Sequence, residues 1–147
     1  MKTILFMGLL VFVVFGIYSF KNPKVNFKED TVGGIHFFEG TIQEALEKAK
    51  KENKPVFIDI YATWCGPCKM LKKNTFSAKE VGDYYNTNFI NIAIDGETKA
   101  GRELADKYSI QGYPTLLILD KTGKQIAKQV GFVEPRILIN FGKRIVP

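Results

Sequence analysis

The amino-acid sequence predicts an α/β domain in which a mixed β-sheet is flanked by helices. Short apolar runs of strand length, such as 56–61 and 115–119, alternate with segments whose apolar residues recur at helical spacing. The last two strand candidates are separated only by the turn-forming run 121–124, so we expect them to form an antiparallel hairpin. The earlier strands are separated by helices, so we expect them to be parallel.

The first elements are predicted from a short apolar segment, a helix cap and a buried strand. Residues 35–38 are a short strand candidate. Thr41 and Glu44 have the spacing of a capping box, which opens a helix. One apolar face of that helix would comprise Ile42, Ala45, Leu46 and Ala49. The following run 56–61 is almost continuously apolar, as expected of a central strand that is covered on both faces.

The middle of the domain is predicted to hold two helices and a strand. A helix is expected to begin at the pair of cysteines and to end near Lys73. Ser77 and Glu80 have the spacing of a second capping box, opening a short helix that ends near Asn86. Residues 89–94 alternate between apolar and polar side chains, which predicts a strand.

The last part of the domain is predicted to complete the sheet and to end in a helix. Residues 99–108 are expected to be helical, and residues 115–119 and 125–130 to be the two strands of the hairpin. Pro135 suits the first turn of a final helix. The apolar residues of that helix would be Ile137, Leu138 and Phe141.

The composition fits one domain with an appendage. Hydrophobic residues make up 46% of the 147 residues, which is enough for a core. The net charge is +6, but the lysines are scattered along the chain rather than clustered. We therefore expect a solvated basic surface and no nucleic-acid site.

The N-terminal segment carries a targeting signal. An uncharged apolar run, 4–20, lies between Lys2 and Lys21, and no Ala-x-Ala cleavage site follows it. We favour a membrane anchor within residues 1–20 over a cleaved signal peptide, because the run reaches the short limit of a membrane span. Residues 21–34 would be a linker and residues 35–147 the folded domain. Either reading places that domain outside the cytoplasm, in the periplasm or secreted, where thiols tend to be oxidised.

The two cysteines of the chain, Cys65 and Cys68, are separated by two residues at a predicted junction between a strand and a helix. The helix dipole at such a place lowers the pKa of the first thiol and makes it a nucleophile. A structural zinc site needs about four ligands, whereas this chain offers two cysteines and the distant His36. A purely structural disulfide that closes so short a loop would stabilise little. Redox catalysis is therefore the favoured reading.

From Val56 to about Gly131 the chain resembles the thioredoxin superfamily. The run 59–65, Asp-Ile-Tyr-Ala-Thr-Trp-Cys, and the run 75–77, Thr-Phe-Ser, are similar to the C-terminal periplasmic domain of DsbD-type thiol:disulfide interchange proteins. Lys73 stands where thioredoxin usually has a helix-kinking proline, which also favours the DsbD-like branch. The Gly66-Pro67 pair between the cysteines is instead like thioredoxin itself.

The resemblance implies a role for each of three residues. Cys65 would be the attacking thiol and the more exposed of the pair, and Cys68 would be buried and would resolve the mixed disulfide. Asp59 is an acid within an apolar strand, and burial there would raise its pKa and let it relay protons near neutral pH. The alternative is that Asp59 sits at a strand end and touches water. Asn91 occupies the place of the lysine that often partners this acid.

Further residues are expected to bind the substrate. Trp64 would flank the cysteines, and Gly66 and Pro67 would shape the loop between them. In the superfamily the peptide bond before the residue corresponding to Pro114 is cis, and the backbone of Tyr113 would pair with an extended substrate segment.

The combined prediction is an exported, membrane-tethered thiol-disulfide oxidoreductase that reduces disulfides in other proteins. A membrane thiol reductant would supply the electrons, and no organic cofactor or metal is implied because the two sulfurs carry the electrons. One alternative is an oxidase or isomerase that makes or shuffles disulfides. Another is a binding module in which the cysteines matter little.

Overall fold

The computed structural model describes residues 33–147. The predicted anchor, 1–20, and most of the predicted linker, 21–34, lie outside the described residues. Among the helices of residues 33–147, none has the length and apolar character needed to cross a membrane.

A mixed sheet of four strands forms the centre of the described domain. The strands are β1 (Val56–Tyr61), β2 (Ile90–Asp95), β3 (Thr115–Leu119) and β4 (Gln125–Val130). Their order in the sheet is β2-β1-β3-β4. The strand β1 is parallel to β2 and antiparallel to β3, and β3 and β4 form an antiparallel hairpin. The predicted fold class, the parallel first pair and the final hairpin are therefore confirmed.

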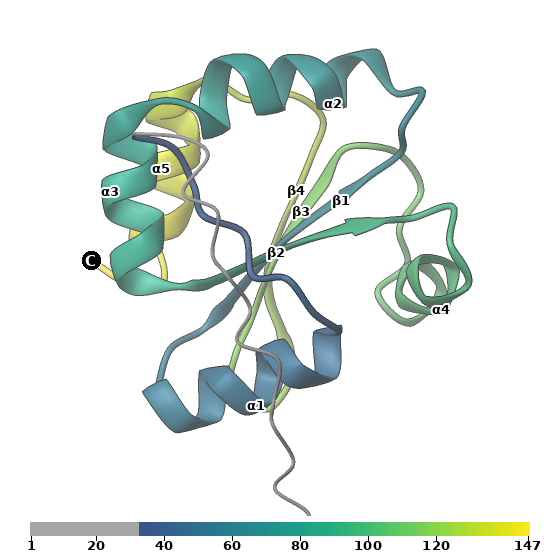
Figure 1. The fold of residues 1–147 in the computed structure, drawn as a ribbon, viewed down its shortest axis with the longest axis horizontal. Coiled ribbons are helices and arrows are strands. Elements are labelled where there is room, and N and C mark those ends of the chain that lie inside the picture. Colours follow the sequence, from purple (N-terminus) through teal and green to yellow (C-terminus); the bar gives the residue numbers. More distant parts are fainter. Residues whose placement is uncertain (1–32) are drawn as a thin grey trace, which may run out of the picture.

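Helices cover both faces of the sheet (Figure 1). One face carries α1 (Ile42–Glu52) and α4 (Lys99–Lys107). The other face carries α2 (Gly66–Met70), which continues directly into the π-helix η1 (Leu71–Phe76), together with α3 (Lys79–Asn88) and α5 (Pro135–Lys143). The sheet is therefore the middle layer of three.

The central strand β1 is buried on both faces, as its apolar sequence predicts. Because side chains alternate along a strand, Phe57 packs toward η1, α3 and α5, whereas Ile58 packs toward α1 and α4. On the first face, Phe57 belongs to a cluster that includes Leu71, Tyr85, Leu138 and Phe141. On the second face, Ile58 belongs to a cluster that includes Ala45, Ala49, Leu104 and Leu117.

Helix caps were predicted correctly at one place and wrongly at another. The capping box of Thr41 and Glu44 is present at the start of α1. The predicted box at Ser77 is wrong, because the Ser77 hydroxyl donates to the backbone oxygen of Lys73 at 2.5 Å and α3 begins after Ala78 without a side-chain cap. The preceding helix also runs beyond Lys73, to Phe76, in π-helical form.

The predicted strand at 35–38 is not formed. The backbone N–H of Ile35 donates to Phe76 at the end of η1, at 2.8 Å, and that of Phe38 donates to Asn91 on β2, at 2.7 Å. The two ends of the segment thus bond to different elements, so it crosses the domain instead of extending the sheet.

Candidate active site

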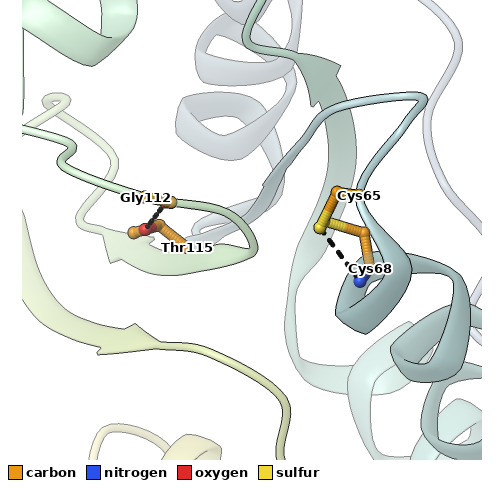
Figure 2. Close-up of a disulfide and its surroundings, with 4 residues drawn as sticks. All are labelled: Cys65, Cys68, Gly112 and Thr115. Atoms are coloured by element: carbon orange, nitrogen blue, oxygen red, sulfur yellow. Dashed lines mark hydrogen bonds between the residues drawn. A yellow bond between two sulfur atoms is a disulfide. The ribbon is translucent and has the colours of Figure 1, made fainter.

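The two cysteines form a disulfide at the start of α2. Cys65 is the N-cap residue of α2, and Cys68 lies in its first turn, with 5.3 Å between the two Cα atoms. The backbone N–H of Cys68 donates to Cys65 Sγ at 3.2 Å (Figure 2). Pro67 lies in the same turn and has no N–H of its own. A hydrogen bond of this kind stabilises a thiolate, so the reduced form is expected to have an acidic Cys65.

The burial of the pair differs from the prediction. Cys65 is 3% exposed and Cys68 is 7% exposed, so the expectation that Cys65 would be the more exposed is wrong for the disulfide form, while Cys68 is buried as expected. The reason is local packing, since the cysteines form a buried cluster with Ala62, and Tyr61 and Tyr113 pack against that cluster.

The loop before β3 lies against the disulfide. The Tyr113–Pro114 peptide bond is cis, as the resemblance implies. Tyr113 packs on the cysteine pair, and the Thr115 hydroxyl closes the loop by donating to the Gly112 oxygen at 2.7 Å (Figure 2). The structure therefore brings Tyr113, the residue before the cis Pro114, to the site.

An aromatic rim lies beside the disulfide. Trp64 is 69% exposed, and its ring meets that of Tyr113 edge to face with 6.1 Å between centroids. At Gly66, a side chain would find no atom within 4 Å, so the loop between the cysteines opens onto free space. An exposed aromatic surface next to an open loop is suited to contact with another protein.

Gly96 is part of the site, although the sequence analysis did not single it out. It lies directly after β2, and its backbone N–H donates to the Tyr61 oxygen at 2.8 Å. A Cβ atom at this position would collide with the ring of Tyr113. Gly96 thereby leaves the space in which Tyr113 lies, and only the Asp-Gly turn signal after a strand could have pointed to it.

Asp59 is buried within β1. It is 7% exposed, and its Oδ1 atom has no hydrogen-bond partner within residues 33–147. Loss of water raises the pKa of this carboxyl to about 7, and the charge of Lys72 opposes that rise. Asp59 therefore lies within β1 and not at a strand end, and its carboxyl is largely withdrawn from bulk water. An acid with this pKa can accept and release a proton near neutral pH.

A cavity of about 410 Å³ connects Asp59 with the cysteine pair. Asp59, Cys68 and Lys72 all line it. The remaining lining residues are Phe37, Tyr61, Ala62, Thr63, Lys69, Phe76 and Ala93. A cavity of this size has room for water, and Asp59 and Lys72 supply polar groups beside Cys68.

The Asn91 side chain does not form a hydrogen bond with Asp59. Its Nδ2 donates to the oxygen of His36 at 3.4 Å and to Asn86 Oδ1 at 3.3 Å, both away from the cavity. The cation that acts on Asp59 is Lys72, which sequence reasoning missed. No group of three or more His, Cys, Asp or Glu side chains that could hold a metal ion is found in the described part of the chain.

Comparison with known proteins agrees with the geometry. The model of the family described as Thioredoxin-like domain matches residues 42–145. The chain is 32% identical to the thiol:disulfide interchange protein DsbD of Pseudoalteromonas atlantica over 107 residues, which are 71% of this chain but only 18% of that relative. The chain thus spans less than a fifth of the length of this curated relative.

Two solved structures are similar in fold and sequence. One, from Bacteroides thetaiotaomicron and provisionally named a disulphide-isomerase, is 40% identical with a TM-score of 0.69, covering 77% of this chain and 93% of that one. The other is the C-terminal domain of DsbD from Neisseria meningitidis in the oxidised form. It is 25% identical with a TM-score of 0.61, covering 76% of this chain and 98% of that one. The predicted resemblance to DsbD-type domains is therefore confirmed.

Proposed function

The chain belongs to the Thioredoxin-like domain family, and from this membership we propose that it reduces disulfides in other proteins by thiol-disulfide exchange. The observation that carries the proposal is the Cys65–Cys68 disulfide, which is closed across the first turn of α2 beside the Pro114 loop. Two sulfurs in this arrangement can hold and release two electrons without an organic cofactor.

The first step is the attack of Cys65 on the client. In the dithiol form, the Cys65 thiolate forms a bond with one sulfur of the client disulfide, and the client S–S bond breaks. The other client sulfur leaves as a thiolate and takes up a proton from water. The hydrogen bond from the Cys68 N–H supports the thiolate before the attack.

The second step releases the client. Cys68 gives its proton to Asp59, directly or through water in the cavity, and its thiolate attacks Cys65 Sγ. The Cys65–Cys68 bond forms, the mixed disulfide breaks, and the second client sulfur leaves as a thiolate that takes up a proton. Two electrons have then moved from the cysteine pair to the client. The step is fast because both cysteines are held in one turn of helix.

Client proteins would bind over the aromatic rim. Trp64 supplies exposed aromatic surface, the partly buried Tyr113 packs beside it, and the loop at Gly66 faces free space. The backbone of Tyr113, next to the cis Pro114, would pair with an extended client segment in the way that a sheet edge binds a strand. Specificity would then depend on unfolded or flexible client segments.

The proposed location and electron donor are supported by the N-terminal sequence and by the similarity to DsbD. The apolar run 4–20 would anchor the chain in a membrane, with the domain on the extracytoplasmic side. Because that side is oxidising, a membrane thiol reductant would restore the dithiol. Carbonate extraction of membranes and protease digestion of spheroplasts, whose outer envelope has been opened, test both points. Release of the chain by carbonate, or its protection from external protease, would contradict them.

A second candidate is disulfide isomerisation or oxidation, and the similarity to the protein from Bacteroides thetaiotaomicron, provisionally named a disulphide-isomerase, favours isomerisation. The reduction potential separates the two directions. Thioredoxin has a potential of about −270 mV, whereas protein disulfide isomerase has one of about −180 mV. The Gly66-Pro67 pair, which is typical of reducing members, supports a value near that of thioredoxin. A potential at or above about −180 mV would favour the second candidate instead.

The proposal is tested by reduction of insulin with the dithiol form of the full chain. The unmodified protein is expected to reduce insulin, Cys65→Ser to be inactive, and Cys68→Ser to accumulate a mixed disulfide with its client, because release is blocked. Insulin left intact by the unmodified dithiol protein would contradict the proposal. Capture of partners by Cys65→Ser at the normal level, without any mixed disulfide, would identify a binding module instead.

A further inference from the structure

The strand pattern of β1 places Asp59 on the face of the sheet that η1 covers. Asp59 lies two residues from Phe57, so both side chains face the same side, and Phe57 packs against Leu71 and Phe76 of η1. The residue beside Asp59 on β2 is Ala93, whose small side chain leaves room. The cavity of about 410 Å³ occupies this room and reaches from Asp59 to Cys68 and Lys72.

Few charged groups on the elements packed around Asp59 face its carboxyl. On the neighbouring strands, Ala93 of β2 and Leu116 of β3 stand opposite Asp59 and cannot ionise. On β1 itself the nearest ionisable group is Tyr61, whose pKa is raised by burial and then by the charges of Asp95 and Asp59. From α2 and η1 the ionisable groups that line the cavity are Cys68, Lys69 and Lys72.

Of these groups, Lys72 is the cation that lowers the pKa of Asp59. Lys72 is exposed, and its side chain also lines the cavity, so the residue reaches from solvent to the space beside Asp59. Its neighbour Lys73 belongs to the same π-helix and is also exposed, but it does not line the cavity. The two lysines therefore form a natural pair of test and control.

We propose that Lys72 is a positioning residue for proton transfer, which stabilises the carboxylate form of Asp59 across the cavity and keeps a base ready for the Cys68 thiol. The inference rests on the proposed function, because it assigns Lys72 to the step in which Cys68 releases the client. The proton leaves Cys68 Sγ, is held on Asp59, and is passed to solvent past Lys72 at the cavity. No cofactor or added reactant takes part in this transfer.

The direct test measures the titration of Asp59 in the oxidised full chain, by the NMR shift of a ¹³C-labelled Asp carboxyl carbon. Lys72→Gln is expected to move the midpoint upward by about half a pH unit, because a cation near the carboxylate is lost. Lys73→Gln, which removes the same charge one residue away, is expected to move it far less. Lys72→Arg is expected to keep the original midpoint.

Salt provides a second readout that a merely structural role of Lys72 would not move. Screening shortens from about 10 Å at 0.1 M salt to about 3 Å at 1 M. The midpoint of the unmodified chain is therefore expected to rise toward that of Lys72→Gln in 1 M salt, while the midpoint of Lys72→Gln itself stays nearly constant.

Kinetics connect the titration to the reaction. At pH 6 the rate at which the mixed disulfide resolves is expected to fall about threefold in Lys72→Gln relative to Lys73→Gln, as half a pH unit implies. The two rates are expected to converge at pH 9, where Asp59 is ionised in both variants. In an Asp59→Asn background, Lys72→Gln is expected to change nothing further.

Equal midpoints for Lys72→Gln and Lys73→Gln would overturn the inference, and so would a pH-independent loss of rate in Lys72→Gln. Failure of the proposed function is distinguishable from this outcome. The titration uses the oxidised protein without a client, whereas the function fails only if the unmodified dithiol chain leaves insulin unreduced.

Discussion

The two faces of the sheet differ in how closely they are packed, and two neighbouring residues of β1 show the difference. Ile58 points toward α1 and α4 and is fully buried in an apolar cluster. Asp59, the next residue, points toward η1, where a carboxyl with an unpartnered oxygen borders a cavity. The first environment stabilises the fold, and the second carries a destabilising group to which we assign the proposed proton transfer. The unfavourable burial of a carboxyl is thus confined to the part of the sheet face that borders the cavity.

The largest expected effect comes from removing Asp59, the acid that borders the cavity on the face covered by η1. In the unfolded chain Asp59 would titrate near its usual value of 3.8, whereas in the folded chain its pKa is about 7. The contribution of protonated Asp59 to the free energy of unfolding is therefore complete below pH ~4. It falls as the pH rises toward 7, and above that pH it no longer changes. With each pKa unit equivalent to about 1.4 kcal/mol, the loss is on the order of 4 kcal/mol. Asp59→Asn is expected to abolish this loss.

Urea denaturation of the oxidised protein between pH 4 and pH 8 measures this prediction. Glu47→Gln, an exposed acid on α1, serves as a control that is expected to keep the pH dependence. A pH dependence in Asp59→Asn as steep as that of the unmodified chain would show that the carboxyl is not the costly group.

The next effect concerns the closely packed face. Ile58→Ala removes a fully buried side chain from the cluster formed with α1 and α4, and it is expected to cost about 3 kcal/mol at any pH. Denaturation curves at pH 5 and pH 8 measure it. Because Ile58 points away from the disulfide, insulin reduction by the folded fraction is expected to stay near normal.

Ile126→Ala is the matched control, since this side chain is exposed on β4 and its loss is expected to cost less than about 0.5 kcal/mol. Equal losses for the two variants would contradict the view that Ile58 belongs to a buried cluster that stabilises the fold. So would a loss in Ile58→Ala that appears at only one of the two pH values.

The smallest effect is expected from adding volume beside Asp59. Ala93→Val places two more methyl groups next to the cavity, in a strand that suits a β-branched residue, so its stability at pH 5 is expected to change by less than about 1 kcal/mol. Further loss of water is expected to raise the pKa of Asp59, so the fall in stability extends to higher pH and its total is larger. A cost as large as that of Ile58→Ala would mean that the cavity offers no spare room.

The sheet was predictable because its signals are local. β1 reads as a buried strand from its apolar run alone, and the residues of β3 and β4 follow from two strand-like runs around a turn. The segment 35–38 was misread because its length and apolar character fit a strand. Its hydrogen bonds go to two different elements, which no local pattern reveals.

The site was predictable where a residue's role depends on its neighbours in sequence. The cysteine pair at a helix start, the acid within β1 and the cis bond before Pro114 all lie where the motifs place them. The contribution of Lys72 and the fit of Gly96 against Tyr113 depend on how distant elements approach each other. The same is true of the burial of Cys65, which comes from the tyrosines around it.

Trp64 is the only tryptophan of the chain, and it lies next to Cys65 at the surface. A disulfide close to an indole ring quenches its fluorescence, so the emission of this one residue is expected to brighten when the bond is reduced. The protein therefore carries an intrinsic optical reporter of its own redox state, and electron exchange with any donor or client can be followed in real time without a dye.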